Sequence, residues 1–160
     1  MLEFHVSETE SAVAYIRPAN AGDARPLARL RAASLLEQGL LAADGVAAFE
    51  IVAEREFTAA LRDGRVAAWL LDSARGARGC ASALFWERLP YAETALHAEL
   101  AGVYVEPSLR GRGFARALCL QAIAAARARG VRSIRVHPSR AAGRLYRDLG
   151  FVDSNELRLG

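Results

Sequence analysis

The chain has 160 residues, of which 52% are hydrophobic and 24% are charged, a composition that excludes an intrinsically disordered protein and fits one globular domain. All 21 basic residues are arginine, so the lysine that a P-loop nucleotide site or Schiff-base chemistry requires is missing. The net charge of +3 conceals 11 arginines against 4 acids over residues 105–160, and 10 against 14 over residues 1–104. The basic C-terminal part favours a phosphate-bearing ligand there, although arginine and alanine also rise in GC-rich coding sequence.

The sequence shows no sign of a membrane segment or of a metal site. No apolar run approaches the roughly 18 residues of a spanning helix, and the N-terminal segment carries acids where a signal peptide carries basic residues. We therefore predict a cytoplasmic protein with no membrane partner. Cys80 and Cys119 lie in apolar segments, which predicts two buried free thiols and no bound metal.

We predict a single domain over residues 1–160, with residues 1–13 as an N-terminal extension. The first part of the chain is expected to form strands and two helices. Short apolar runs predict strands at 14–17, 66–71 and 81–86, the last two joined as an antiparallel hairpin by the turn-rich sequence DSARGARG. Apolar residues at helical spacing predict helices over about 24–35 and 46–61.

The second part alternates strands and helices. It predicts strands at 97–105 and 131–136, helices at 114–129 and 140–149, and a weak terminal strand that includes Phe151 and residues 156–159. We therefore predict an α/β fold, because two helices precede an antiparallel stretch and strand–helix–strand units follow it. Its central sheet is expected to be mixed and mostly antiparallel, with helices on its faces.

A glycine-rich corner, SLRGRGFA, joins a predicted strand directly to a helix. Gly111 and Gly113 allow backbone conformations in which successive N–H groups converge on one anion, and the helix N-terminus adds further donors. One alternative is a plain turn with its arginines in solvent. A dinucleotide-binding turn is disfavoured, because Arg116 replaces the last glycine and no acid follows about 20 residues later.

Two segments carry a resemblance to a known family. The sequence VEPSLRGRGFARAL, with Arg110, Gly113 and Ala115 as [Q/R]-x-x-G-x-[G/A], resembles the acyl-CoA-binding motif of the GNAT superfamily of N-acyltransferases. Downstream, SRAAGRLYRDLGF resembles a second hallmark of that superfamily, N-x-x-A-x-x-L-Y-x-x-x-G-F, with Ser139 where asparagine is usual. The resemblance implies a single-domain GNAT-like fold.

The resemblance also implies that acetyl-CoA is the co-substrate. Its pyrophosphate would lie on the backbone of the glycine corner, and its pantetheine along the preceding strand, which a bulge at Gly102 would separate from the next strand. The residues assigned to acetyl-CoA in this way are Val103, Tyr104, Val105, Arg110, Gly111, Arg112, Gly113, Phe114, Ala115, Arg116, Ser139 and Tyr146. A backbone N–H near Val105 is expected to stabilise the oxyanion.

Two side chains are candidates for proton transfer. Tyr146 matches the family residue that protonates the departing thiolate; the alternative is an aromatic anchor in its helix. Glu99 is the candidate base, because it shares strand parity with Val103 and Val105 on an apolar face that would raise the pKa of its carboxyl, unless a bulge turns it to solvent. His97 and His137 are the alternatives.

The sequence therefore predicts an N-acetyltransferase that moves an acetyl group to a primary amine by direct attack in a ternary complex. A small cationic amine or a peptide N-terminus would suit the acids near the expected acceptor side, namely Glu37, Asp44, Glu50, Glu54, Glu56, Glu87 and Glu93. A catalytically silent acyl-CoA-binding regulatory module is the alternative. We do not expect nucleic acid as a partner, since the sequence indicates neither an aromatic stacking platform nor a helix-turn-helix. A homodimer is compatible with the sequence.

Overall fold

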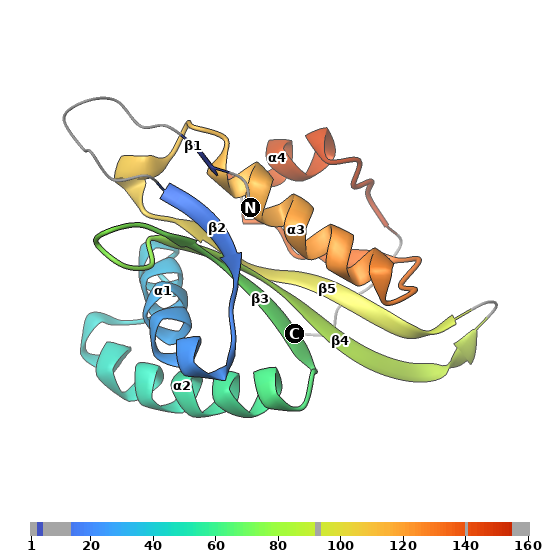
Figure 1. The fold of residues 1–160 in the computed structure, drawn as a ribbon, viewed down its shortest axis with the longest axis horizontal. Coiled ribbons are helices and arrows are strands. Elements are labelled where there is room, and N and C mark those ends of the chain that lie inside the picture. The colour runs from blue at the N-terminus through green and yellow to red at the C-terminus, as the bar shows by residue number, and fades with distance from the viewer. Residues whose placement is uncertain (1–2, 5–13, 92–93, 140, 155–160) are drawn as a thin grey trace.

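A six-stranded sheet forms the centre of the structure, and helices cover both of its faces (Figure 1). The computed structural model describes residues 3–4, 14–91, 94–139 and 141–154. The strands follow one another in chain order across the sheet, as β1 (Glu3–Phe4), β2 (Ala14–Pro18), β3 (Val66–Asp72), β4 (Gly79–Tyr91), β5 (Thr94–Val105) and β6 (Ile134–Val136). Every neighbouring pair is antiparallel except β5 and β6, which are parallel. This confirms the predicted single-domain α/β fold with a mixed, mostly antiparallel sheet.

Helices α1 (Ala24–Glu37) and α2 (Val46–Arg62) pack on one face of the sheet (Figure 1). The apolar spacing that predicted α1 puts Leu27 and Leu30 against the sheet, where both are fully buried. They pack there with Leu70 of β3 in one apolar cluster. Burying a leucine side chain stabilises a fold by about 1.5–3 kcal/mol, so this face anchors the N-terminal half.

The opposite face is covered by α3 (Phe114–Ala128) and α4 (Gly143–Asp148). The apolar stripe of α3, with Leu118 and Ala122 at its centre, packs on Leu71 of β3 and Leu100 of β5. Helix α3 follows β5 directly through a short turn, so the strand end and the helix start lie next to each other. The core therefore fixes the corner in which the glycine-rich sequence lies.

The predicted antiparallel hairpin is present at the centre of the sheet. Strands β3 and β4 pair from Val66↔Leu84 to Leu71↔Gly79, and Arg78 N–H donates to the Leu71 carbonyl at 2.8 Å. The loop between them turns at Gly76, whose φ of +86° favours glycine. This turn lies at the same end of the sheet as the end of β5, since Gly79 also pairs with Val105.

Several predicted bounds near the termini are wrong. The strand expected at 131–136 begins only at Ile134, because Val131 is buried and its N–H still donates to Ala126 of α3 at 3.1 Å. The helix expected at 140–149 spans only Gly143–Asp148, and residues 151–154 form no strand. Residues 156–159 lie outside the described residues. Within the segment expected to be an N-terminal extension, Glu3–Phe4 pair with β2.

Both cysteines, Cys80 and Cys119, are free and buried as predicted, and burial raises the pKa of each thiol to about 12.

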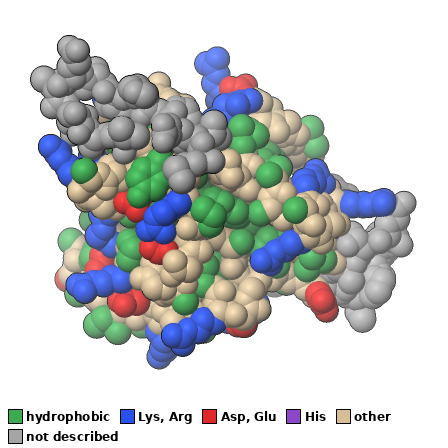
Figure 2. Space-filling model, viewed as in Figure 1, with side chains coloured by type: hydrophobic (Ala, Val, Ile, Leu, Met, Phe, Trp, Pro, Cys, Tyr) green, Lys and Arg blue, Asp and Glu red, His purple; other side chains and the backbone are tan. Residues whose placement is uncertain are grey.

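Among the helices of the described residues, none has the length and hydrophobicity to cross a bilayer. On the face drawn in Figure 2, arginine side chains are spread around the surface rather than gathered into one stripe.

Candidate active site

The candidate site begins where β5 and β6 diverge. The two strands pair only from Ala98↔Ile134 to Leu100↔Val136, and β5 then continues to Val105 after β6 has ended. In the described part of the chain, no strand pairs with residues 101–105 on that side. Their peptide groups therefore form a short open strand edge, to which an extended ligand with amide groups can hydrogen-bond.

A bulge lies at Gly102, just beyond the point where β5 and β6 separate, as the resemblance implied. Cys80 pairs with Tyr104 while Ser82 pairs with Ala101, so β5 holds one more residue than β4 across this step. Gly102 has φ +62°, and its carbonyl accepts a hydrogen bond from the Cys80 thiol at 3.1 Å. The extra residue bends the strand and reverses the side-chain alternation beyond it.

That reversal overturns the predicted surroundings of Glu99. Before the bulge, Ala98 and Leu100 point into the core under α3, and after it Val103 and Val105 do so. Glu99 therefore lies on the opposite face of the sheet from Val103 and Val105, not on their apolar face. The sequence argument assumed uninterrupted alternation, which the bulge removes.

His137, which directly follows β6, is the side chain that meets Glu99. Its Nδ1 lies 3.1 Å from the Glu99 Oε1, and the two side chains are 64% and 30% exposed. The pair joins the two diverging strands at the start of the open edge. His97, the other histidine candidate, instead stacks on Trp86 with 5.9 Å between ring centroids.

Beyond Val105 the chain makes a tight corner into α3. A short 3-10 turn, Pro107–Leu109, leads to Gly111 and Gly113, whose φ values are +76° and +82°. A Cβ at either glycine would touch nothing within 4 Å, so backbone conformation and not space selects glycine there. Gly113 is the N-cap of α3, and no side-chain hydrogen bond caps the helix there. Backbone N–H groups at a helix N-terminus can donate hydrogen bonds to an anion.

The three arginines of the corner have different surroundings. Arg110 is fixed by the protein itself: its Nε donates to the Val105 carbonyl at 2.8 Å, and its Nη atoms lie 2.7 and 2.6 Å from the two carboxylate oxygens of Glu37. That contact holds the pKa of Glu37 below its ordinary value. Arg112 and Arg116 are exposed, and neither forms an ion pair within the described ranges.

Tyr146 reaches the site from α4. It is buried in the same cluster as Val105, Phe114 and Cys119, and its ring meets Phe151 edge to face at 5.7 Å between centroids. Burial, with a smaller contribution from Cys119, raises the pKa of Tyr146 to about 12. The phenol therefore keeps its proton at neutral pH and can donate it to a stronger base.

The predicted cofactor residues therefore do not all lie on the same side of the sheet. Val103, Val105, Phe114, Ala115 and Tyr146 converge on the side of the sheet that carries α3 and α4. Tyr104 points to the other side, where it packs against the α1 cluster and under Arg110, 5.5 Å from the ring centroid. Ser139 is half-buried before α4, and its carbonyl accepts from Ala142 N–H at 3.0 Å.

The acids expected near the acceptor lie in different surroundings. Glu37 is bound by Arg110, and Glu56 pairs with Arg55 on the exposed side of α2 at 3.1 Å. Glu87 is exposed at the far part of β4, and Glu93 lies outside the described residues. Among the residues that the structure describes, no group of three His, Cys, Asp or Glu side chains is arranged to hold a metal ion.

Comparison with known proteins gives one family match. The model of the family described as "Acetyltransferase (GNAT) family" matches residues 31–151. No curated protein sequence matches the chain significantly.

Solved structures share the fold over nearly the whole chain. A predicted acetyltransferase from Clostridium acetobutylicum, crystallised with acetyl-CoA, is 22% identical over 92% of this chain and 96% of its own, with a TM-score of 0.81. A GCN5-related N-acetyltransferase from Ralstonia eutropha JMP134 is 23% identical over 92% and 97%, also with a TM-score of 0.81. An aminoglycoside N-acetyltransferase in complex with CoA is 17% identical over 96% and 97%, with a TM-score of 0.71. At these identities the likeness shows a common fold.

Proposed function

Because this chain belongs to the GNAT acetyltransferase family, which transfers acetyl groups from acetyl-CoA, we propose that it acetylates a primary amine by direct attack in a ternary complex. The observation that best supports the proposal is the open edge of β5 followed at once by the uncapped N-terminus of α3. The open strand edge suits the amide groups of the pantetheine arm, and the helix N-terminus suits the pyrophosphate. These two features adjoin in the same order as the two groups do in acetyl-CoA.

In this proposal the backbone corner binds the anionic part of acetyl-CoA. The backbone N–H groups from Gly111 to Arg116 donate hydrogen bonds to the pyrophosphate oxygens, and Arg112 and Arg116 add positive charge from the solvent side. The pantetheine arm lies along residues 103–105, and the Ser139 hydroxyl is its further hydrogen-bond partner. Arg110 holds the corner in place, because it ties the Val105 carbonyl to the end of α1.

The transfer needs one bond formed, one bond broken and two protons moved. The neutral amine attacks the thioester carbonyl carbon, and a backbone N–H near Val105 stabilises the oxyanion, a contact whose loss costs about 3 kcal/mol. The carbon–sulfur bond then breaks, and the leaving thiolate takes the proton of the Tyr146 hydroxyl. The raised pKa of Tyr146 keeps that proton in place until the thiolate forms.

We assign the removal of the amine proton to Glu99, with His137 as the residue that positions it. Their contact places a carboxylate and an imidazole at the point where the two strands separate. The Glu99 carboxylate accepts the proton directly or through a water molecule, while the Nδ1 contact fixes its orientation.

The acceptor is proposed to be a small cationic amine or a peptide N-terminus. Asp44, Glu50 and Glu54 on and before α2 provide negative charge on the side of the sheet that Glu99 faces. An ammonium group approaching there would be attracted before it loses one proton to solvent, and the neutral amine then loses its second proton to Glu99 as it attacks.

The test is release of free CoA thiol from acetyl-CoA in the presence of a panel of primary amines and peptides. We expect amine-dependent release with ternary-complex kinetics, in which both substrates must be bound. Tight acetyl-CoA binding without transfer to any amine would instead identify a catalytically silent acyl-CoA-binding module.

A further inference from the structure

The face of the sheet that carries Glu99 is not fully covered by helices. Helices α1 and α2 pack on this face, but β4 and β5 extend beyond the ends of both helices (Figure 1). Leu84 of β4 is 38% exposed, and the side chain of Glu99 is 30% exposed. A large apolar side chain is therefore open to solvent on the same part of the sheet as the proposed base.

Strand register places two aromatic side chains beside Leu84 and Glu99. Leu84 pairs directly with Glu99, and Trp86 pairs with His97. Directly opposed residues of an antiparallel pair point to the same face, and so do residues two apart on one strand. Leu84, Trp86 and His97, here called the acceptor patch, therefore share a face with Glu99. Diagonal neighbours such as Trp86 and Glu99 lie about 7–8 Å apart.

The indole ring of Trp86 is held by two neighbours. It stacks on the imidazole of His97, with 5.9 Å between ring centroids and 23° between ring planes. The guanidinium carbon of Arg135, on β6, lies 5.9 Å from the centroid of the same indole ring, a cation–π distance. Trp86 is half-buried, so part of its side chain still meets solvent. An aromatic surface that is already fixed loses little conformational entropy when a ligand packs on it.

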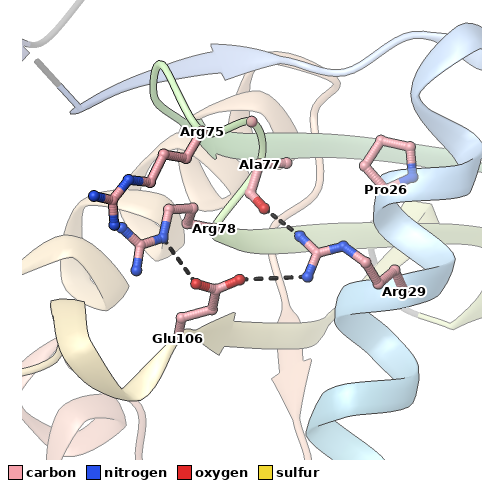
Figure 3. Close-up of a pocket in the computed structure, with 7 residues that line it drawn as sticks. Pro26, Arg29, Arg75, Ala77, Arg78 and Glu106 are labelled. Carbon is pink, nitrogen blue, oxygen red and sulfur yellow. Dashed lines mark hydrogen bonds and ion pairs between the residues drawn. The ribbon is translucent and has the colours of Figure 1, made fainter. Parts of the chain in front are cut away.

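The other end of this face, next to the glycine corner, is charged. Arg29, Arg78 and Glu106 line a cavity of about 400 Å³ there (Figure 3). Glu106 binds both arginines, with Oε1 3.3 Å from Nη1 of Arg29 and Oε2 2.8 Å from Nε of Arg78. An apolar group placed against these ion pairs would remove water from them at a cost. An apolar substituent on an amine at Glu99 is therefore favoured toward the acceptor patch and disfavoured toward the corner.

We propose that the acceptor is a primary amine that carries an aromatic ring on a short aliphatic linker. The inference rests on the proposed acetyl transfer and names the acceptor class of that same site. With the amine nitrogen at Glu99, a linker of two carbons and a ring together cover the diagonal to Trp86. The ring packs on the indole and on Leu84, where aromatic pairs gain energy beyond the burial of area. The products are the N-acetyl amide of the amine and CoA.

The experiment measures kcat/KM for three amines by release of free CoA thiol, with acetyl-CoA saturating. The amines are phenethylamine, cyclohexylethylamine, which has the same linker and an apolar ring without a flat face, and butylamine. We expect phenethylamine to exceed butylamine by about tenfold or more and cyclohexylethylamine by about threefold.

Two variants test the acceptor patch through the ratios between amines, which a general loss of activity would not change. Trp86→Leu keeps an apolar side chain but removes the flat face, so the preference for phenethylamine over cyclohexylethylamine should disappear. Leu84→Asn should lower the preference for phenethylamine over butylamine by about threefold or more. The matched control is Leu120→Asn, since Leu120 is 41% exposed on α3, on the opposite side of the sheet. It should keep both ratios.

Thermal melts verify that each variant is folded. Leu84 is an exposed position, so Leu84→Asn decides the question even where Trp86→Leu does not fold. Equal kcat/KM for the three amines in the wild type would overturn the inference, as would an unchanged ratio in either folded variant or the same loss in Leu120→Asn. Transfer without any preference overturns this inference alone. Absence of transfer to every amine contradicts the proposed function, and the inference with it.

Discussion

The Nδ1 atom of His137 lies 3.1 Å from Oε1 of Glu99, across the point where β6 ends and β5 continues alone. The two residues are 38 positions apart in the sequence: Glu99 lies on β5, and His137 directly follows the neighbouring parallel strand β6. The contact exists because Glu99 pairs in register with Arg135 and His137 follows two residues later. It places a proton acceptor at the mouth of the open strand edge.

Glu99→Gln should depress the transfer rate most at low pH. The amide keeps the size of the carboxylate but cannot accept a proton, and deprotonating the amine is hardest in acid. The measurement is the pH profile of kcat/KM, with Asp153→Asn as the control for loss of an exposed carboxylate. His137→Ala, which removes the contact to Glu99, should lower the rate less and change the same limb of the profile. An effect of Glu99→Gln that is uniform across pH would remove Glu99 from the role of base.

Tyr146→Phe should lower kcat by about 100-fold or more, because general acid catalysis typically contributes about 10²–10⁴-fold. The acetyl-CoA dissociation constant should stay within a few-fold, since the ring and its packing on Phe151 are retained. Stopped-flow transfer and calorimetry measure the two quantities. Tyr15→Phe on β2 is the matched control for losing a phenol elsewhere. Unchanged turnover under conditions in which chemistry limits the rate would leave Tyr146 with a packing role only.

Gly113→Ala should weaken acetyl-CoA binding and also destabilise the fold by about 1–2 kcal/mol, because alanine is strained at φ +82°. Gly64→Ala is the matched control, since Gly64 has φ +76° at the end of α2 and likewise has nothing within 4 Å of an added Cβ. The control should lose similar stability and keep its acetyl-CoA affinity. Urea denaturation and calorimetry test this pair; similar affinities in both variants would contradict the assigned pyrophosphate corner.

The acid sensitivity of the fold should depend on Asp23. Its carboxylate accepts hydrogen bonds from Arg17 at 2.9 and 2.8 Å, and the Nε of Arg17 lies 2.9 Å from Asp72 on β3. Arg17 lowers the pKa of Asp23 from its ordinary value of 3.8. A carboxyl with a lowered pKa in the fold stabilises it above that ordinary value and loses the contribution as the pH falls through its native pKa.

Asp23→Asn should therefore reduce the free energy of unfolding by about 1–2 kcal/mol at pH 7. The difference between the variant and the wild type should shrink as the pH falls below 3.8 toward the lowered native pKa of Asp23, because the unfolded chain takes up the proton first. Urea denaturation at pH 7 and pH 3 measures both quantities. A difference that persists unchanged at pH 3 would assign the effect to packing and not to charge.

Local sequence signals were sufficient for much of this architecture. The apolar spacing of α2 and α3, the hairpin with its turn and the corner around Gly113 were all predicted, because each depends on residues within one element or one turn. The bulge in β5 was implied by the resemblance to the GNAT superfamily, and the glycine in this strand indicated its place at Gly102. The resemblance to the GNAT superfamily added Tyr146, which is buried and whose raised pKa keeps its phenol protonated at neutral pH.

Features that depend on tertiary contacts could not be read from the sequence. The parity argument for Glu99 failed because one inserted residue at the bulge reverses the alternation. The resemblance assigned Arg110 to acetyl-CoA binding. In the structure, however, the carboxylate of Glu37, 73 positions away, binds both of its Nη atoms. The partnership of Glu99 and His137 depends on strand register, which no short motif encodes. The start of β6 at Ile134 follows from the burial of Val131 beneath α3.

The most direct test of the account is a titration of acetyl-CoA followed by backbone amide resonances of the isotopically labelled protein. If the open edge of β5 and the start of α3 hold the coenzyme, saturable shifts should be largest for residues 103–105 and 111–116. Shifts confined to other parts of the chain, or no association at all with folded protein, would contradict the proposed site and the residue roles that depend on it.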